Sequence, residues 1–355
     1  MKNGTMENDD FALSCPTPIL NYDTIQLAHG AGGRLSAELI EKVFLPCFEN
    51  EILLKLEDQA QLEKPNGRIA FTTDSFVVSP IFFPGGNIGD LAVNGTVNDI
   101  CMSGAIPLYL SVGFIIEEGF EVSELCRIVD SMGKAAKTAG VRIVTGDTKV
   151  VNRGSCDKIF INTSGIGVIP NDINLGAGYI KPGDKVILSG TIADHGMSVM
   201  TARDGLSFES RINSDTAGLN YLVRDMFKVS KKIHAMRDPT RGGVAAILNE
   251  FARSSNTGIR LFEETIPVSD EVKGACELLG LDPLYVANEG KLIAITASED
   301  AGKIVEKMQC NDLGKKACII GEVTDENAGK VTLRNIYGIE RILDMPIGEQ
   351  LPRIC

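Results

Sequence analysis

Residues 123–149 read SELCRIVDSMGKAAKTAGVRIVTGDTK, and the pattern of this segment decides the fold class. From Ser123 to Ala139, apolar residues recur every three or four positions and form one stripe, which predicts an amphipathic helix. The β-branched residues of Val141-Arg142-Ile143-Val144 predict a strand that leads into Gly146-Asp147-Thr148-Lys149. A helix that is followed directly by a strand is typical of α/β and α+β proteins, in which helices pack on a sheet.

The same alternation continues through both halves of the chain. Further helices are expected at 36–48 (with Ser36 as its cap), 88–102, 216–227, 242–254, 269–279, 299–307 and from 198 onward. Further strands are expected at 68–74, 108–116, 159–168, 185–188, 258–262, 292–296 and 319–323. Asn, Gly and Pro gather at 170–182, which indicates a domain boundary. We therefore predict an α/β or α+β fold with a leader (1–22), two domains (23–170 and 171–341) and a mobile tail (342–355).

Composition limits the partners that the chain can have. With 35 Lys and Arg against 47 Asp and Glu, the net charge is −12 over 355 residues. This balance argues against nucleic acid or an anionic membrane as a partner, because both require clustered cations. The nine cysteines form no Cys-x-x-Cys pair, which fits a reducing compartment and predicts a cytoplasmic protein. No apolar run approaches the length of a membrane span.

Four acidic segments are the strongest chemical signal. They are Thr72-Thr73-Asp74-Ser75, Asn98-Asp99-Ile100, Thr145-Gly146-Asp147-Thr148-Lys149 and Asp238-Pro239-Thr240-Arg241-Gly242-Gly243. We expect each to be a loop, and a single aspartate of this kind is often only a cap or turn residue. Four together favour a magnesium–nucleotide site, because Mg²⁺ prefers carboxylate oxygens and usually bridges phosphates. In an extended segment, Asp147 and Lys149 would lie on the same face.

Three other segments are open to a functional or a structural interpretation. The glycine-rich stretch from His29 to Arg34 could cover phosphates or serve as a flexible entry to a helix. Glu289, in Asn288-Glu289-Gly290, could be a general base or a turn residue. Segment 190–198 resembles a phosphate loop but lacks its lysine, so we expect a turn there. His195 and His234 are expected to be structural or supporting residues.

The chain ends in Leu351-Pro352-Arg353-Ile354-Cys355, so the last residue is a thiol. Pro346, Gly348 and Pro352 disfavour a helix in this tail. Fully extended from residue 343, it could reach about 40 Å at about 3.3 Å per residue. Such a thiol could visit a distant site and carry a small group, although a terminal cysteine can also be incidental.

The quoted motifs, together with Ala28-His29-Gly30-Ala31-Gly32-Gly33, Asn288-Glu289-Gly290 and the terminal Pro-Arg-Ile-Cys, resemble those of the HypE family. These are hydrogenase maturation factors within the aminoimidazole ribonucleotide synthetase-like superfamily. The resemblance runs from about residue 25 to Cys355, and the terminal motif is its most specific part. It implies a two-domain fold, a homodimer whose N-terminal sheets join in a barrel-like core, and ATP in a cleft between the domains.

The resemblance also implies residue roles and a reaction. Asp74, Asp99 and Asp238 would hold Mg²⁺–ATP. Lys149 and Glu289 would act beside the reacting group. Residues from the glycine-rich stretch and from two strands would bind the nucleotide: His29, Gly30, Gly32, Gly33, Thr73, Thr145, Gly146, Asp147 and Thr148. A carbamoyltransferase, HypF, would load Cys355 with a carboxamide. ATP would then drive its dehydration to a thiocyanate, the source of the cyanide ligand delivered to hydrogenase iron on a HypC–HypD complex.

Two other kinds of function stay open at this point. The first is another ATP enzyme of the superfamily, such as a selenophosphate synthetase or an aminoimidazole ribonucleotide synthetase. The former would need a cysteine near the glycine-rich stretch, which here has His29 and Arg34 instead. The second is a non-catalytic thiol carrier or scaffold, which would not need the four acidic segments.

Overall fold

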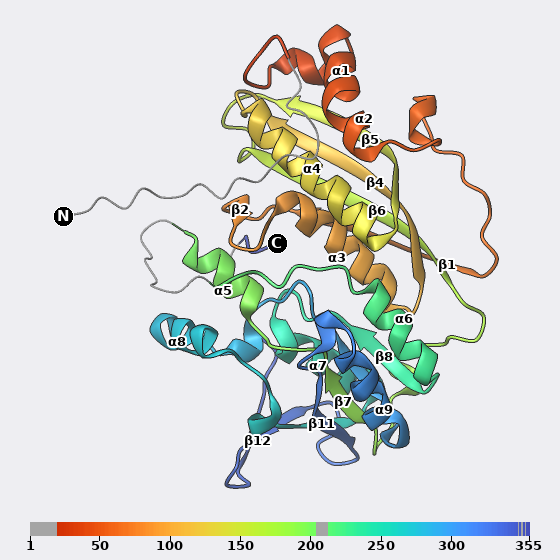
Figure 1. The fold of residues 1–355 in the computed structure, drawn as a ribbon. Coiled ribbons are helices and arrows are strands. Elements are labelled where there is room, and N and C mark those ends of the chain that lie inside the picture. The colour runs from red at the N-terminus through yellow and green to blue at the C-terminus, as the bar shows by residue number, and fades with distance from the viewer. Residues whose placement is uncertain (1–19, 204–211, 347, 349–350, 352) are drawn as a thin grey trace.

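A computed structural model describes residues 20–203, 212–346, 348, 351 and 353–355. Two domains lie one above the other, and the C-terminus ends between them, beside β2 (Phe82–Phe83) and α3 (Ile88–Met102) (Figure 1). The expected leader, 1–22, falls almost wholly outside the described residues.

The N-terminal domain is built on a four-stranded sheet in the order β1–β6–β4–β5. The strands are β1 (Arg68–Phe76), β4 (Ile106–Glu117), β5 (Arg142–Val151) and β6 (Ile159–Ile169), with a small hairpin of β2 and β3 (Gly86–Asn87). Strands β4 and β5 are parallel and are joined by α4 (Val122–Ala139), whereas β6 is antiparallel to both of its neighbours.

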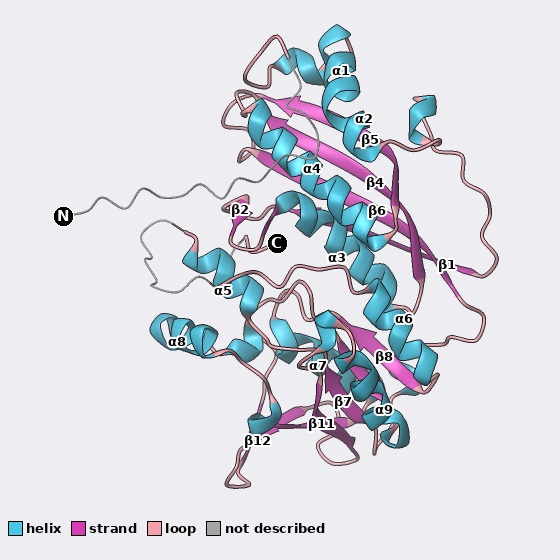
Figure 2. Cartoon of the chain, in the orientation of Figure 1, coloured by secondary structure: helices cyan, strands magenta, loops and turns pink. Residues whose placement is uncertain are grey.

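Helices cover one face of this sheet and leave the other face open (Figure 2). Helices α3 and α4 pack on each other, and α3 also contacts β1, β4 and β6. Helices α1 (Arg34–Leu39) and α2 (Leu45–Phe48) are joined by a π-helical turn at Ile40–Phe44. The helix-facing residues of β4, Leu110, Val112, Phe114 and Ile116, are buried. The opposite face exposes Ile69, Phe71, Ile106 and Ile115.

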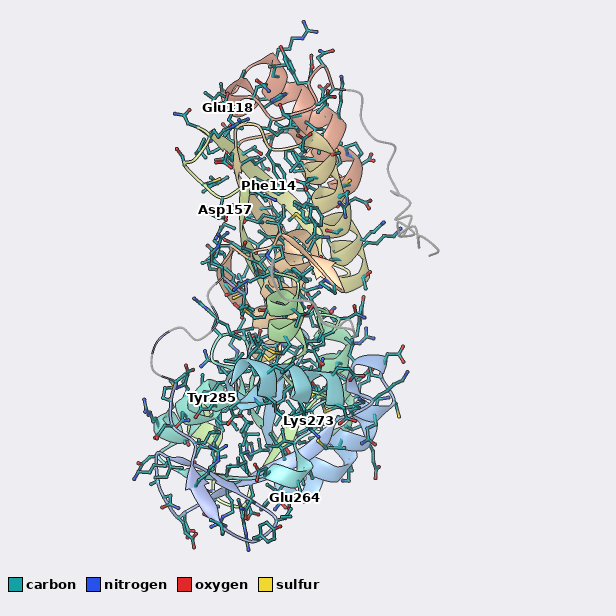
Figure 3. All side chains as sticks on the ribbon, turned by 90° about the vertical axis from the view of Figure 1, so that its left-hand side faces the viewer. Phe114, Glu118, Asp157, Glu264, Lys273 and Tyr285 are labelled. Carbon is teal, nitrogen blue, oxygen red and sulfur yellow. The ribbon has the colours of Figure 1, made fainter. Side chains whose placement is uncertain are left out.

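The C-terminal domain contains a seven-stranded sheet in the order β13–β12–β9–β11–β7–β10–β8. Its strands are β7 (Lys185–Leu188), β8 (Ile233–Arg237), β9 (Gly258–Phe262), β10 (Ile293–Thr296), β11 (Cys318–Thr324), β12 (Val331–Arg334) and β13 (Glu340–Ile342). Its helices are α5 (Asp194–Thr201), α6 (Asn220–Val229), α7 (Gly243–Ser255), α8 (Asp270–Leu279) and α9 (Ser298–Gln309). Strands β7 and β10 are buried almost throughout because they lie in the middle of the sheet. Figure 3 shows both domains filled with side chains, with Phe114 in the upper domain and Tyr285 in the lower.

The mixed fold class predicted from the sequence is confirmed, but three local expectations are wrong. Asp147 lies within β5 and not in a loop after it, whereas Asp74 in β1 and Asp99 in α3 lie where the expected strand 68–74 and helix 88–102 place them, and Asp238 lies in a loop. Ser36 lies inside α1, and Gly33 is the residue that precedes the helix. Residues 194–198 are the start of α5 and not a turn. Among the described residues, no helix is both long enough and apolar enough to cross a membrane.

Candidate functional site

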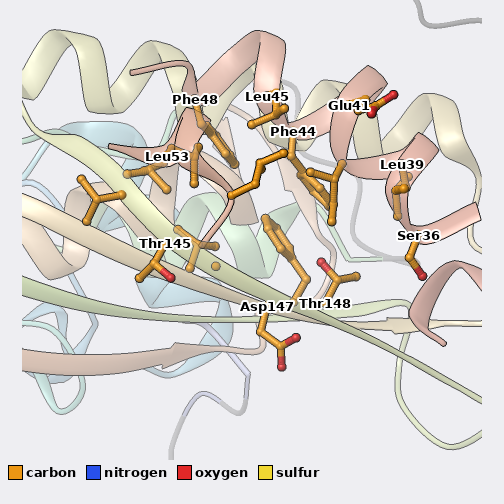
Figure 4. A pocket seen from close by; sticks show the side chains of 18 of the residues that line it. Ser36, Leu39, Glu41, Phe44, Leu45, Phe48, Leu53, Thr145, Asp147 and Thr148 are labelled. Atoms are coloured by element: carbon orange, nitrogen blue, oxygen red, sulfur yellow. The ribbon is translucent and has the colours of Figure 1, made fainter. Parts of the chain in front are cut away.

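The first group of expected site residues lines a pocket of about 400 Å³ between the glycine-rich stretch and β5 (Figure 4). His29, Gly30 and Gly32 come from one side, and residues 145–149 come from the other. A Cβ atom on Gly30 would lie 2.5 Å from the backbone nitrogen of Val150, so only glycine allows this close approach. The structure therefore brings together two segments that the sequence separates by more than 100 residues.

The pocket has an apolar lining with polar groups at its rim. Phe44 stacks on Phe114 with ring centroids 4.9 Å apart, and Phe48 lies beside them. His29 is buried; its Nδ1 accepts a hydrogen bond from the Gln26 backbone, and burial lowers its pKa. A neutral imidazole beside apolar side chains can contact a planar or phosphorylated ligand without a desolvated charge of its own.

Asp147 and Lys149 lie on the open face of the sheet, as their alternation along an extended segment predicts. Their side chains form an ion pair at 2.9 Å and are 69% and 63% exposed. In Figure 4, Asp147 points away from the apolar lining that includes Phe44. The lysine holds the pKa of Asp147 below its usual range, so this carboxylate is ionised at neutral pH.

The second group consists of four acids between the two domains. Asp74 comes from β1, Asp99 from the last part of α3, Asp238 from the loop after β8 and Glu289 from the segment before β10. Helix α3 contacts both β1 and β8, which explains how residues from two domains meet there. Asp99 and Asp238 also line one shared pocket with Thr72 and Thr240.

Crowding of these carboxyl groups changes their acidity. Burial, reinforced by the charges of Asp99 and Asp74, raises the pKa of Asp238 to about 7. Burial raises the pKa values of Asp74 and Asp99 as well. The pKa of Glu289 is raised well above its usual range by burial and then by the charge of Asp238, and its Oε1 is buried without a hydrogen-bond partner. Such a set of acids disfavours its own ionisation and favours an incoming cation.

Two asparagines hold this group in place. Asn98 donates from Nδ2 to the carbonyl oxygens of Ala217 and Glu289, and its Oδ1 accepts from the Leu219 backbone. Asn288 donates to the carbonyl oxygens of Pro239 and Val286 and accepts from the Ala193 backbone. These bonds fix the Glu289 segment against the Asp238 loop and against α3.

The loop that carries Asp238 depends on two glycines. Gly242 and Gly243 have φ angles of +77° and +62°, and a Cβ on Gly243 would lie 2.6 Å from the Leu284 carbonyl oxygen. These glycines let the chain turn sharply into α7. Within the described ranges, no three or more His, Cys, Asp or Glu side chains form a ready-made metal-binding set.

The C-terminal tail is bonded to the segment that follows the strand of Asp74. The backbone nitrogen of Val77 donates to the Cys355 carbonyl oxygen at 3.2 Å, and Val77 follows β1 three residues after Asp74. Ile354 is only 3% exposed and packs into the main hydrophobic core. The tail is therefore held beside the strand that carries Asp74.

The expected site residues thus fall into two places. The glycine-rich stretch and residues 145–149 share one pocket, whereas Asp74, Asp99, Asp238 and Glu289 lie between the domains. Thr73 faces the open side of the sheet, where Asn162 and Ser164 donate to its hydroxyl. Lys149 and Glu289, expected beside one reacting group, belong to different groups within a single chain.

The sequence does not mark two residues with largely buried side chains that support Glu289. Asp215 accepts from the Glu289 backbone at 3.1 Å and pairs with Lys291 at 3.0 Å. Nothing local in the sequence marks Asp215, because its partners lie more than 70 residues away. His195, interpreted as a supporting residue, contacts the tail directly.

The two α/β domains with a group of acids between them are typical of the AIR synthase related proteins, and comparison with known proteins supports this class. Two family models match this chain: "AIR synthase related protein, N-terminal domain" over residues 56–169, and "AIR synthase related protein, C-terminal domain" over residues 181–334.

Individual relatives narrow the class to one family. "Carbamoyl dehydratase HypE" of Azotobacter vinelandii is 50% identical over 336 residues, which is 95% of this chain and 98% of that protein. A crystal structure of the hydrogenase maturation protein HypE in complex with ATP superposes with a TM-score of 0.90 at 48% identity, over 94% of this chain and 100% of that one. A HypE–HypF complex matches with a TM-score of 0.77 at 53% identity, over 87% and 99% of the two chains. This chain belongs to the HypE family.

Proposed function

We propose that this chain is an ATP-dependent carbamoyl dehydratase that acts on its own C-terminal cysteine. The substrate is a carboxamide on the Cys355 sulfur, and the product is a thiocyanate that supplies the cyanide ligand of [NiFe]-hydrogenase iron. The observation that carries the proposal is the hydrogen bond between Val77 and Cys355, which keeps the terminal residue next to the strand of Asp74.

Loss of water from a carboxamide needs a better leaving group than oxide. Transfer of the γ-phosphoryl group of ATP to the carboxamide oxygen makes that oxygen part of a phosphate. The C–O bond then breaks, phosphate leaves with the oxygen, and two protons leave the nitrogen as the C≡N bond forms. The products are the thiocyanate on Cys355, ADP and phosphate.

Glu289 is the proposed base for the nitrogen protons. Its raised pKa makes its carboxylate, when ionised, a stronger base than that of an exposed glutamate. The unpartnered Oε1 leaves one oxygen available for a substrate. The backbone bonds from Asn98 and to Asp215 fix the position of this residue, so little reorganisation is needed during the reaction.

The residues around Glu289 also fit a divalent cation. Asp74, Asp99 and Asp238 are hard oxygen donors, and burial raises the pKa of each, so their ionised forms would gain from a bound cation. Mg²⁺ would be held by these three carboxylates and by nucleotide oxygens, and it would neutralise charge on the phosphates. The glycine-rich stretch and residues 145–149 would contact the rest of the nucleotide.

A homodimer would complete the nucleotide site. The open face of the N-terminal sheet carries exposed apolar side chains that a second copy would cover: Ile69, Phe71, Ile106 and Ile115. Asp147 and Lys149 lie on this same face, so in such a dimer they face the other chain. The nucleotide site then draws on two chains, which accounts for the separation of Lys149 from Glu289 within one.

The reaction requires one partner that donates the carbamoyl group and one that accepts the cyanide. A carbamoyltransferase of the HypF kind loads the thiol, and an iron-bearing HypC–HypD complex accepts the cyanide. The HypE–HypF complex among the similar structures supports the first of these partners. We place the reaction in the cytoplasm, where the cysteines stay reduced.

The dimer can be tested with one substitution. Phe71, which is 69% exposed on the open face, should be central to the contact. Phe71→Asp would bury a charge in an apolar interface, so we expect dimer dissociation to increase at least about 100-fold in analytical ultracentrifugation. Tyr337→Asp is the matched control, because Tyr337 is 80% exposed on the β12–β13 hairpin. A Phe71→Asp variant that is as dimeric as the control would move the interface elsewhere.

The function itself is tested by single-turnover phosphate release. Chain that carries a carboxamide on Cys355 is mixed with ATP and Mg²⁺, and phosphate is measured over time. We expect one phosphate per chain, with at least about 100-fold slower release from chain that was never carbamoylated. Equal rates from the two forms would show that ATP hydrolysis is not coupled to the tail.

A further inference from the structure

The last three residues occupy a binding site built from both domains. The backbone nitrogens of Val77 and Ser79 donate to the carbonyl oxygens of Cys355 and Arg353, at 3.2 and 3.1 Å. This spacing, residues 77 and 79 against 355 and 353, is that of a short antiparallel pairing. The tail thus adds to the segment that directly continues β1.

Side chains close the site around this pairing. Arg203 donates to the carbonyl oxygens of both Ser79 and Arg353, so it bridges the two paired segments. Arg353 donates from Nε to the Val77 carbonyl oxygen and forms an ion pair with Asp157. We call the set Val77, Ser79, His195 and Arg203 the tail dock.

His195 is the most informative member of the tail dock. It is fully buried, and its Nε2 lies 2.9 Å from the carbonyl oxygen of Ile354. A carbonyl oxygen only accepts, so Nε2 carries the proton and donates to it. In the neutral ring, Nδ1 then accepts from the Ser214 hydroxyl at 2.8 Å, and the Ser214 oxygen accepts from the Thr216 backbone.

This chain of hydrogen bonds satisfies both ring nitrogens only while the tail is docked. A buried polar group that loses its partner is costly, so the imidazole favours the docked tail. Its surroundings add the edge-on ring of Phe83 and the nearby charge of Asp215. His195 is fully buried, so solvent does not replace the Ile354 carbonyl oxygen as the partner of its imidazole in the docked state.

The same network reaches the proposed base. Ser214, which binds His195, is followed by Asp215, which accepts from the Glu289 backbone and pairs with Lys291. On the other side of the tail, Val77 lies three residues after Asp74. The tail dock therefore connects the last residues to the segment that follows β1 and, through His195 and Ser214, to the segment that binds the Glu289 backbone.

We propose that His195 is a positioning residue that holds the penultimate carbonyl of the tail and thereby sets the Cys355 sulfur in its reacting position. The proposal rests on the proposed function for its catalytic consequence. The tail must leave the dock to be loaded by a carbamoyltransferase and must return to be dehydrated. Weakening the dock should therefore slow dehydration and speed loading, two effects of opposite sign that general damage to the fold would not produce.

The first test does not depend on any enzymatic activity. Purified full-length chain is treated with N-ethylmaleimide, and modification of Cys355 is followed by mass spectrometry of the C-terminal peptide. We expect His195→Leu to raise the modification rate at least about tenfold. His195→Gln retains a donor near Nε2 and should restore the rate to within about threefold of the original. An unchanged rate in a folded His195→Leu variant overturns the proposal.

Two further variants separate docking from folding. Ser198→Ala is the matched control, because Ser198 is buried on the same helix but binds the Pro84 carbonyl oxygen and not the tail. It should leave the rate within about twofold. Ile354→Ala leaves the His195 ring and its carbonyl partner in place but removes the buried side chain that packs the tail, so with folding checked by circular dichroism it should raise the rate as His195→Leu does. No increase with Ile354→Ala would likewise contradict the dock.

The second test measures the catalytic consequence. In chain already carbamoylated, His195→Leu should slow ATP-driven dehydration at least about tenfold, with ATP affinity unchanged and loading by the carbamoyltransferase as fast as or faster than in the original. Slower loading together with slower dehydration would contradict a positioning role. If no variant dehydrates a carboxamide, the proposed function fails while the alkylation result still decides on the dock.

Discussion

Replacement of Cys355 by alanine is expected to abolish thiocyanate formation, with a loss of at least about 1000-fold. The sulfur is the attachment point of the carboxamide, and no other group can take its place in the covalent sequence. ATP affinity should stay within about twofold, because the Val77 bond is made by the backbone of residue 355 and the acids are untouched. The measurements are product analysis by mass spectrometry and calorimetric titration with Mg²⁺–ATP.

Cys310→Ala is the appropriate control for this variant. Cys310 is an exposed thiol on the C-terminal domain, at the end of α9, and should be dispensable. If the Cys355→Ala protein still formed thiocyanate, the reacting sulfur would have to be another one. A parallel loss of activity in Cys310→Ala would mean that thiol removal in general, and not the terminal position, causes the effect.

Replacement of Asp238 by asparagine is expected to weaken Mg²⁺–ATP binding at least about tenfold. Asp238 lies at the centre of the acidic group, since it raises the pKa of Glu289 and responds to Asp99 and Asp74. An amide of the same shape leaves the packing intact but removes one of the charges that a cation needs. Isothermal titration of the metal-free variant with ATP, with and without Mg²⁺, separates the metal contribution from that of the nucleotide.

Asp312→Asn controls for the change of net charge. The Asp312 side chain is 89% exposed and pairs with Lys315 in the same turn, so its removal should alter the affinity by less than about twofold. An Asp238→Asn protein that binds as tightly as this control would remove Asp238 from the nucleotide site. Equal weakening in the absence of Mg²⁺ would assign Asp238 to the nucleotide and not to the metal.

Regular elements could be predicted well where one pattern dominates. Helix α3 and strands β7 and β9 have the bounds that the sequence predicts. Strand β8 was missed, since Ile233–Arg237 is short and interrupted by His234. Strands β12 and β13 were also missed; β13 is fully exposed and has no apolar alternation to mark it.

The acidic segments show why local sequence was insufficient for the site. Gly146, Asp147 and Thr148 read as a loop because Gly and Asp are depleted in strands. Pairing of β5 with β4 overrides that preference and extends the strand to Val151. The sequence therefore marks Asp74 and Asp147 as candidate site residues. Only the pairing of the strands in the folded chain determines that they lie on opposite faces of one sheet.

The tail illustrates a second limit. The described residues of the tail form no helix, as its prolines and glycine predict, but its partners, Val77 and His195, lie more than 150 residues away in sequence. No periodicity or motif connects such positions, because the contact depends on how the two domains pack. The Asp215–Lys291 pair cannot be predicted from the sequence either, because it also joins segments that are far apart in the chain.

The most direct test of the central claim follows the mass of the C-terminal peptide. Full-length chain is carbamoylated by its carbamoyltransferase, ATP and Mg²⁺ are added, and the protein is digested and analysed by mass spectrometry. The account predicts that the peptide ending in Cys355 gains one carboxamide and then loses one water only when ATP is present. Loss of water from a different peptide, or from this peptide without ATP, would contradict it.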